Sequence, residues 1–257
     1  MSAPELLYDM KDSVAWLTLN REARRNALSP GMIELFQEYL DRAESDDQAR
    51  VLCLTGAGEK AFCSGADLAQ SFEATDHVAG ARKYAEMLKR LASYPKPLVA
   101  RVNGHCLAGG LGLMLSCDLV YARDGVKIGA PEVNVGLFPM MIGALIFRNS
   151  IRKKALEMIY TAKMLSAAEA EEMGLITRAV PAGDLDRVVE DALAAISAKA
   201  PVAIKLGRQA LAVASELGLD EALDFLCGKL GEVVSTEDAK EGLTAFMQKR
   251  TPVWKGR

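Results

Sequence analysis

The pattern of hydrophobic and polar positions divides the chain into a part with strands and helices and a part with helices alone. Short apolar runs bounded by glycine, proline or polar residues predict strands at 14–19, 51–55, 98–102 and 176–180. After these runs only helical periodicity is present, with helices predicted from Asp184 to about Lys199 and then after Pro201, Asp220 and Ser235. This break predicts a mixed α/β core followed by a C-terminal helical region.

The central stretch, residues 98–139, combines a strand with an unusual glycine turn. After Asn103 and Gly104, the sequence Ala108-Gly109-Gly110 opens an apolar segment that predicts a buried helix, and a strand pair comes after it. The first turn of a helix leaves its N–H groups unpaired, and glycine lets a ligand approach them. Such N–H groups suit an oxygen that gains negative charge. Close packing against a neighbouring element also favours glycine, and the stretch alone leaves both interpretations open.

An earlier stretch has the same layout of strand, glycine turn and small residues. The strand at 51–55 leads through Gly56 and Gly58 to the segment Ala61–Leu68. Two such places could each direct one backbone N–H at a common oxygen. In the earlier stretch Ala66 is the predicted donor, and Asp67 is predicted to cap the next segment of the chain.

Several local signals predict where helices begin. Ser29 is a good N-cap before Pro30, and Ser166 with Glu169 forms a predicted capping box. Asp238 predicts a second capping box for the helix after Ser235. Residues 70–80 are polar and aperiodic, which predicts a mobile loop. The helix after this loop is predicted from a face formed by Ala81, Tyr84, Leu88 and Leu91.

Composition excludes several classes of protein. The 257 residues are 50% hydrophobic and carry a net charge of −3, so the chain has no basic excess for nucleic acid. No apolar run reaches the roughly 18 residues of a membrane span, and the N-terminus lacks the apolar region of a signal peptide. Two histidines and five cysteines without CxxC spacing do not predict a metal site. An odd, scattered cysteine count indicates reduced thiols and a cytoplasmic location.

The sequence offers few candidates for catalysis. The third glycine of GxGxxG is missing after Gly112, and neither a phosphate-binding Gly-Lys-Ser/Thr nor a GxSxG motif is present. Glu132 lies among apolar and small residues, where desolvation would raise the pKa of its carboxyl and make it a proton shuttle near neutrality. A glutamate after proline is also typical of a helix N-terminus. Arg21, Arg24 and Arg25 could meet an anionic ligand or form a solvated loop.

The sequence resembles the crotonase family of enoyl-CoA hydratases and isomerases over nearly its whole length. The resemblance rests on motifs in the family's order, at 25–28 (RNAL), 62–68 (FCSGADL), 103–110, 117–118, 131–136 and 240–246. It implies an α/β fold in which ββα units form a spiral core at 1–195. It further implies a C-terminal α-helical trimerisation region at 196–257, and therefore a homotrimer or a dimer of trimers.

The resemblance also implies the substrate and its site. The substrate would be a coenzyme A thioester, with no permanently bound cofactor and no metal. The N–H groups of Ala66 and Gly109 would form the oxyanion hole, and Glu132 would be the acid and base. Phe246 and Lys255 would reach a neighbouring subunit's coenzyme A. The residues implied to bind substrate are Arg24, Ala27, Ala66, Asp67, Leu68, Gly109, Gly112 and Phe138.

One departure from the family pattern bears on the reaction. Hydratases of the family carry two catalytic glutamates, and the position of the first is Gly112 here. A single glutamate suffices for allylic isomerisation, so the sequence favours isomerisation by Glu132. Two alternatives stay open: a hydratase whose water is held by other groups, and a catalytically silent acyl-CoA-binding protein. His105 and Cys106 could substitute for the missing acid, although packed side chains are the more common role for such residues.

Overall fold

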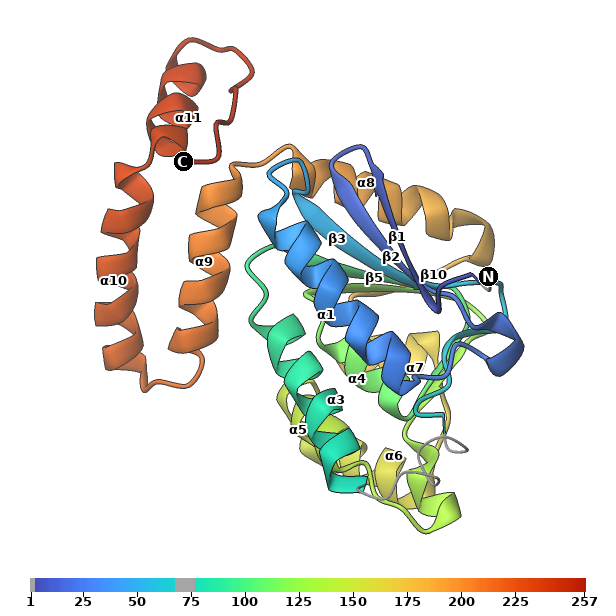
Figure 1. Cartoon of the computed structure of the whole chain (residues 1–257). Helices are drawn as coiled ribbons and strands as arrows, with labels where there is room; N and C mark the ends of the chain where they lie inside the picture. Colours follow the sequence, from blue (N-terminus) through green and yellow to red (C-terminus); the bar gives the residue numbers. More distant parts are fainter. Residues whose placement is uncertain (1–2, 68–76) are drawn as a thin grey trace.

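The computed structural model describes residues 3–67 and 77–257, and within them two sheets form the core (Figure 1). The larger sheet contains, in spatial order, β1 (Leu6–Lys11), β2 (Val14–Leu19), β3 (Val51–Gly56), β5 (Leu98–Val102), β7 (Leu119–Arg123) and β10 (Arg178–Val180). The smaller sheet contains β4 (Ala61–Cys63), β6 (His105–Leu107), β8 (Lys127–Gly129) and β9 (Leu165–Ser166).

The strands follow a repeating plan. In the pairs β3–β4, β5–β6 and β7–β8, the first strand joins the larger sheet and the second joins the smaller one. Neighbours β2, β3, β5, β7 and β10 are parallel, whereas β1 runs antiparallel to β2. Because each unit places strands in both sheets and then continues into a helix or helical turn, the chain winds as a spiral of ββα units. The predicted fold class is confirmed.

Helices cover both faces of the larger sheet (Figure 1). Other helices lie at the bottom and at the left of the molecule in the view of Figure 1. Successive strand residues point to opposite faces, so Leu52 and Leu54 pack toward one side and Val51 and Cys53 toward helix α8 (Leu185–Ser197) on the other. The α-helices of the core are α1 (Pro30–Ser45), α3 (His77–Ala92), α4 (Gly109–Leu115), α5 (Met140–Asn149), α6 (Arg152–Thr161), α7 (Ala167–Glu172) and α8 (Leu185–Ser197). Short 3₁₀ helices are η1 (Glu22–Arg24), η2 (Pro131–Val135) and η3 (Ala182–Asp184).

The last helices stand beside the core rather than over a sheet (Figure 1). They are α9 (Pro201–Ala214), α10 (Leu219–Ser235) and α11 (Glu237–Met247). Arg208 on α9 joins them to the core, because its Nε donates to Asp118 at 2.9 Å and its Nη2 donates to the Leu91 carbonyl at 3.2 Å. Asp118 in turn accepts from the Leu98 N–H at the start of β5, so this contact fixes α9 against the central strands.

The predicted helix caps are confirmed at two places and wrong at one. The Ser29 side chain caps α1, and Ser166 and Glu169 form the predicted capping box. Thr236, not Ser235, caps α11. Asp238 forms no capping box because its buried carboxylate accepts from the N–H groups of the C-terminal residues Lys255 and Gly256.

The loop predicted at 70–80 is wrong at its end, because α3 already begins at His77, and residues 70–76 lie outside the described residues. Sequence reasoning also missed β1, β4, β6 and β9. Three of these strands have two or three residues, which is too short for an apolar alternation to stand out.

Candidate active site

The two glycine segments singled out in the sequence meet in the structure. Leu28 donates its N–H to the Gly65 carbonyl at 2.8 Å and accepts from the Asp67 N–H at 2.8 Å. These two bonds turn the N–H of Ala66 away from Leu28. On the facing segment, a Cβ built on Gly109 would lie 3.5 Å from the Ala66 nitrogen. Gly109 is the first residue of α4, so its N–H has no acceptor within the helix.

Strained backbone brings these segments together. Ala108 has φ 49° and ψ −127°, a conformation that costs an L-residue energy, and Gly65 has φ 97°. A Cβ at Gly65 would lie 2.7 Å from the Ala108 Cβ and 3.1 Å from the Gly109 nitrogen. The close approach of Ala66 and Gly109 therefore requires glycine at position 65 and a left-handed turn at position 108. We call the pair of segments 65–66 and 108–109 the backbone cradle.

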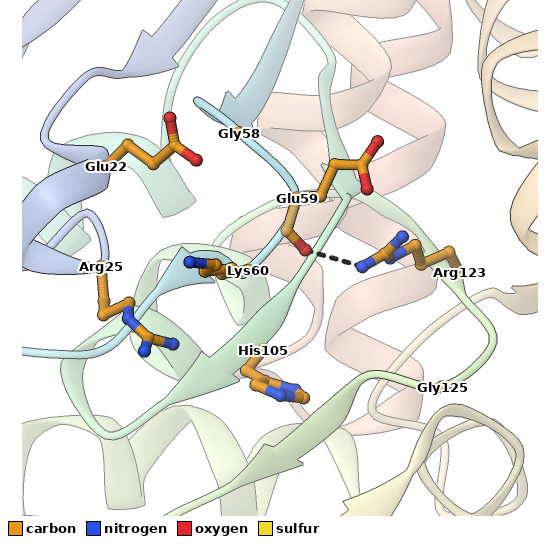
Figure 2. Close-up of a pocket in the computed structure, with 8 residues that line it drawn as sticks. All are labelled: Glu22, Arg25, Gly58, Glu59, Lys60, His105, Arg123 and Gly125. Carbon is orange, nitrogen blue, oxygen red and sulfur yellow. Dashed lines mark hydrogen bonds between the residues drawn. The ribbon is translucent and has the colours of Figure 1, made fainter.

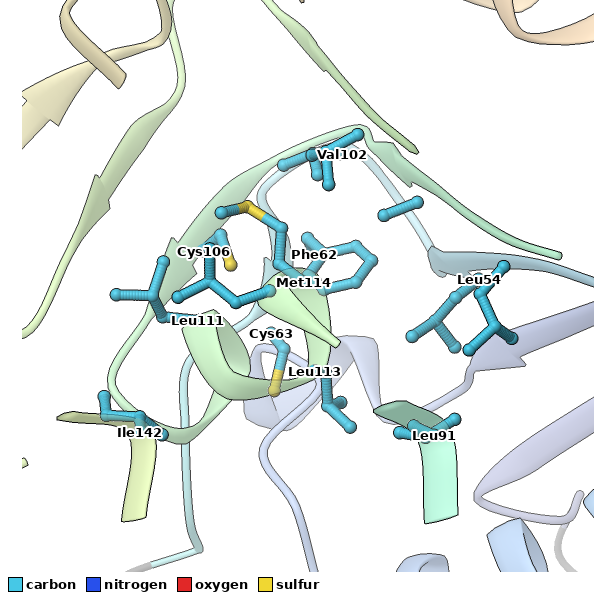
Figure 3. Close-up of a cluster of buried hydrophobic side chains, with 14 of the residues drawn as sticks. Leu54, Phe62, Cys63, Leu91, Val102, Cys106, Leu111, Leu113, Met114 and Ile142 are labelled. Atoms are coloured by element: carbon cyan, nitrogen blue, oxygen red, sulfur yellow. The ribbon is translucent and has the colours of Figure 1, made fainter. Parts of the chain in front are cut away.

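The two glycines that begin α4 serve different purposes. A Cβ at Gly110 would lie 2.5 Å from the Cys63 carbonyl oxygen and 2.7 Å from its Cβ, so Gly110 permits close packing on β4. A Cβ at Gly109 would meet only ordinary van der Waals contacts, so packing does not require glycine there. The rest of α4 is embedded in the hydrophobic core, where Leu111, Leu113 and Met114 lie near Phe62 and Cys106 (Figure 3). A buried helix gives the cradle a rigid support.

Polar side chains fix the loop at 21–28, which pairs with the cradle segment through Leu28. The Asn26 amide is fully buried and donates to the carbonyls of Ala57 and Ala61 at 3.0 and 2.7 Å. The Arg21 guanidinium donates to the Ala27 carbonyl at 2.7 Å and pairs with the Asp67 carboxylate at 2.8 Å. Arg21 therefore ties the segment after Ala66 to the loop before Leu28, which is neither of the roles that the sequence suggested for it.

Glu132 lies at the first turn of η2, as a glutamate after proline favours. Gly136, at φ 76°, ends this turn, and the Leu137 N–H donates to the Glu132 carbonyl at 3.1 Å. The Oε2 atom of Glu132 is buried and has no hydrogen-bond partner in the described part of the chain. Burial raises the pKa of Glu132 above its ordinary 4.5, and a hydrogen bond with its own backbone N–H opposes this shift. The raised pKa predicted from the sequence is confirmed, and it suits a group that takes and returns protons.

Tyr84, which the sequence predicted only as part of a helix face, has its hydroxyl next to Gly112. A Cβ built on the buried Gly112 would clash with the Tyr84 hydroxyl oxygen and would lie 2.7 Å from Ile142 Cγ2. The Tyr84 hydroxyl donates to the Gly109 carbonyl at 2.5 Å. Burial, followed by the charges of Cys63, Cys106 and Glu132, raises the pKa of Tyr84 well above 10. The hydroxyl thus stays protonated at neutral pH and lies where the Glu132 charge acts on it.

The remaining predicted residues are spread around the cradle. Arg24 is exposed on η1, and the carbonyl of the buried Ala27 is occupied by Arg21. Phe138 is 44% exposed just before α5, beside other exposed apolar residues. Leu68 lies outside the described residues. No group of three or more histidine, cysteine, aspartate or glutamate side chains within 3–67 and 77–257 is placed to hold a metal ion.

His105 and Cys106 have structural surroundings. His105 Nδ1 accepts from the Lys127 N–H at 2.9 Å, which joins β6 to β8. Cys106 is fully buried, and burial raises the pKa of its thiol well above 9.

A pocket of about 600 Å³ opens on the His105 side of the smaller sheet (Figure 2). Its lining combines basic and acidic side chains: Glu22, Arg25, Gly58, Glu59, Lys60, His105, Arg123 and Gly125. Arg123 is held there by a 2.6 Å bond to the Glu59 carbonyl. Ala66, Gly109 and Glu132 are not among the lining residues, so this pocket is separate from the cradle. It borders the same segment, since the Arg25 carbonyl accepts from the Ser64 N–H at 3.1 Å.

Comparison with known proteins identifies the class to which this fold and site belong. Residues 9–257 match the protein family described as enoyl-CoA hydratase/isomerase. The chain is thus an acyl-CoA-processing enzyme, and it belongs to the enoyl-CoA hydratase/isomerase family of the crotonase superfamily. No helix in the described ranges is long and apolar enough to span a bilayer.

Named relatives cover nearly the whole chain. The chain is 33% identical to a short-chain-enoyl-CoA hydratase of Clostridium acetobutylicum, over 97% of each protein. It is 34% identical to the 2,3-dehydroadipyl-CoA hydratase of Escherichia coli, covering 98% of this chain and 99% of that one. The crystal structure of an enoyl-CoA hydratase from Bacillus anthracis superposes with a TM-score of 0.93 at 32% identity, over 98% of this chain and 100% of that one.

Proposed function

We propose that this enzyme shifts the double bond of an enoyl-CoA thioester, with Glu132 as its single acid and base. The observation that supports the proposal is the buried, unpaired Oε2 of Glu132, whose raised pKa suits both removal and return of a proton. Position 112, where a second catalytic carboxylate would lie in a hydratase, is a glycine covered by Tyr84. The site therefore has the group that proton transfer needs and lacks the one that would help to hold a water.

The proposed reaction needs no co-reactant. Glu132 removes a proton from the carbon next to the thioester carbonyl, and the electron pair moves onto the thioester oxygen to give a dienolate. The N–H groups of Ala66 and Gly109 would hold that oxygen, and each such donor is typically worth about 3 kcal/mol in the transition state. The protonated Glu132 then returns the proton at the far end of the diene. The double bond moves into conjugation, and every atom of the substrate is retained.

Hydration of a 2-enoyl-CoA is the second candidate, because the named relatives are hydratases. In that reaction a group other than residue 112 would have to hold the water. The two candidates differ in their products: hydration adds the mass of one water, and isomerisation leaves the mass unchanged.

The test is incubation with panels of 2-enoyl- and 3-enoyl-CoA thioesters, with products separated by chromatography and identified by mass spectrometry. We expect 3-enoyl-CoA to become 2-enoyl-CoA without gain of mass. Glu132→Gln should lower turnover by about 10²–10⁴-fold while coenzyme A binding persists. Glu172→Gln, an exposed carboxylate at the end of α7, is the matched control and should behave as wild type.

Three outcomes would contradict the proposal. Full activity in Glu132→Gln would remove Glu132 from the mechanism. Fast hydration by the wild type would support the hydratase instead. Binding of acyl-CoA without turnover of any substrate in the panel would indicate a catalytically silent binding protein.

We further propose that residues 196–257 mediate a homotrimer or a dimer of trimers. Large apolar side chains are exposed along α10 and α11, among them Leu219, Leu230, Leu243 and Phe246. Exposed apolar surface of this kind marks an interaction site, and light scattering would measure the assembly.

We also propose a cytoplasmic location, which the five free cysteines, all within the described ranges, support.

A further inference from the structure

The Tyr84 side chain crosses from α3 to the buried side of α4, opposite Gly112. Its hydroxyl oxygen occupies the space in which the side chain of residue 112 would begin. The other atoms close to a Cβ built on Gly112 are Ile142 Cγ2, at 2.7 Å, and Leu88 Cδ1, at 3.3 Å. Residue 112 therefore cannot carry any side chain while Tyr84 keeps this position.

The same hydroxyl makes a second contact one turn earlier on α4. It donates to the Gly109 carbonyl at 2.5 Å, and Gly109 is half of the backbone cradle. This carbonyl belongs to the residue whose N–H is the second proposed donor, so the bond restrains the orientation of Gly109. Tyr84 is only 8% exposed, which keeps water from competing for the bond.

The groups around the hydroxyl leave it no role as a base. Apart from the Gly109 carbonyl, the titratable groups that act on it are the buried thiols of Cys63 and Cys106 and the carboxylate of Glu132. All three disfavour a tyrosinate, so the hydroxyl keeps its proton. Tyr84 can fill space and donate a hydrogen bond, but it cannot deprotonate a water as a second glutamate would.

We propose that Tyr84 is the residue that restricts this site to proton transfer: it excludes a carboxylate and its water from position 112 and positions Gly109 for the thioester oxygen. The inference rests on the proposed function and names the residue that determines its specificity. Tyr84 is a positioning residue, because it acts through Gly109 and through the volume that it occupies. The two contributions can be separated by substitution.

Tyr84→Phe tests the hydrogen bond, because phenylalanine keeps the ring and removes the hydroxyl. We expect kcat for isomerisation to fall about tenfold with KM nearly unchanged, since the bond orients a donor that acts mainly in the transition state. Tyr160→Phe, whose side chain is 65% exposed on α6, is the matched control and should keep both constants. A kcat for Tyr84→Phe equal to that of wild type would overturn the positioning role.

The pair Gly112→Glu and Tyr84→Ala/Gly112→Glu tests the volume. We expect Gly112→Glu alone to be destabilised and inactive as a hydratase, because its Cβ would clash with the hydroxyl oxygen. The double variant lacks the Tyr84 ring, so only the end of the Ile142 side chain must shift to admit the new side chain, and the variant should gain hydration of crotonyl-CoA by at least tenfold over wild type. A folded double variant that binds coenzyme A without this gain would overturn the exclusion role.

A stability measurement keeps the inference falsifiable if the double variant does not fold. Gly112→Ala should lower the melting temperature more in wild type than in Tyr84→Phe, because loss of the hydroxyl oxygen leaves the end of the Ile142 side chain, at 2.7 Å, as the one remaining contact below 3.0 Å. Equal losses in the two backgrounds would contradict the inference. This stability result is also distinct from failure of the proposed function. That failure would appear in the chain with Tyr84 intact, either as no isomerisation or as isomerisation that Glu132→Gln leaves unchanged.

Discussion

The backbone cradle and the acid–base side chains of this site are built in different ways. The cradle is made from main-chain atoms whose positions are fixed by several independent restraints: the buried Asn26, the Arg21–Asp67 ion pair and the left-handed turn at Ala108. The proposed acid–base part is one carboxylate, Glu132, with an oxygen that no described residue pairs. Several restraints therefore fix the cradle, whereas the other half of the site depends on one side chain.

This difference indicates which positions of the fold can be substituted to change the reaction. Gly109 and Gly112 lie one turn apart on the same helix, yet Gly109 faces the cradle and Gly112 faces Tyr84. A substitution in the cradle disturbs the main chain and every reaction that passes through an enolate. A substitution around position 112 changes which proton transfers or additions can take place. We therefore expect variants of the two regions to fail differently.

The largest effect that sharpens this comparison is expected for Gly109→Ala. Its new methyl group would lie 3.5 Å from the Ala66 nitrogen, in ordinary van der Waals contact with its neighbours. We expect kcat to fall about 10²–10³-fold, as for loss of an oxyanion donor, with almost no change in stability. Steady-state kinetics and thermal unfolding of the same sample measure both quantities.

Gly110→Ala is the matched control for that variant, because it adds the same methyl group at the next residue. There the methyl would lie 2.5 Å from the Cys63 carbonyl oxygen, so the expected loss is in stability. If Gly109→Ala keeps full activity, the Ala66 and Gly109 donors do not form the oxyanion hole.

Much of the fold could be predicted from the sequence because its signals are local. Strands β2, β3 and β5 are short runs rich in apolar residues, and Ser29 and Ser166 begin their helices with polar caps. Strands β4, β6 and β9 of the smaller sheet could not, because two or three residues carry no period. Asp238 misled for a related reason: a carboxylate three residues into a helix suggests a capping box, whereas here the distant C-terminus supplies its partners.

For the site, the sequence predicted the residues but not their surroundings. The repeated layout of strand, glycine turn and small residues suggested that two segments could direct N–H groups at one oxygen, and the family resemblance named Ala66 and Gly109. The structure brings these two residues together. Their role as oxyanion donors stays a prediction. Tyr84 could not have been found, because a tyrosine in a helical face is ordinarily a core residue and its position over Gly112 depends on how α3 packs on α4. A glycine in place of an expected acid was the only signal that something else fills the space.

A smaller effect, in stability, is expected for Gly65→Ala. The new Cβ would lie 2.7 Å from the Ala108 Cβ, and the backbone at φ 97° disfavours any L side chain. We expect the free energy of unfolding to fall by about 1–3 kcal/mol. Gly207→Ala in α9 is the control, because a Cβ there meets nothing within 4 Å and should stabilise the helix by about 0.5–1 kcal/mol. Denaturant unfolding of both variants measures the contrast, and equal stabilities would show that the cradle is not strained at position 65.

The smallest effect is expected in the acid–base region, where Glu132→Gln should stabilise the fold that it inactivates. Burial raises the folded-state pKa of Glu132, so the folded chain holds this proton more tightly than the unfolded chain. Stability is then lost as the pH rises from the ordinary value of 4.5 through the raised pKa, and the loss is complete above it.

Glutamine has no charge to bury, so the variant should be modestly more stable than wild type at about pH 7, and the difference should shrink below the ordinary value. Thermal unfolding of both proteins across this pH range measures it. A variant less stable than wild type at neutral pH would mean that the carboxylate is stabilised in the folded state, and Glu132 would then be poorly suited to carry a proton between two carbons.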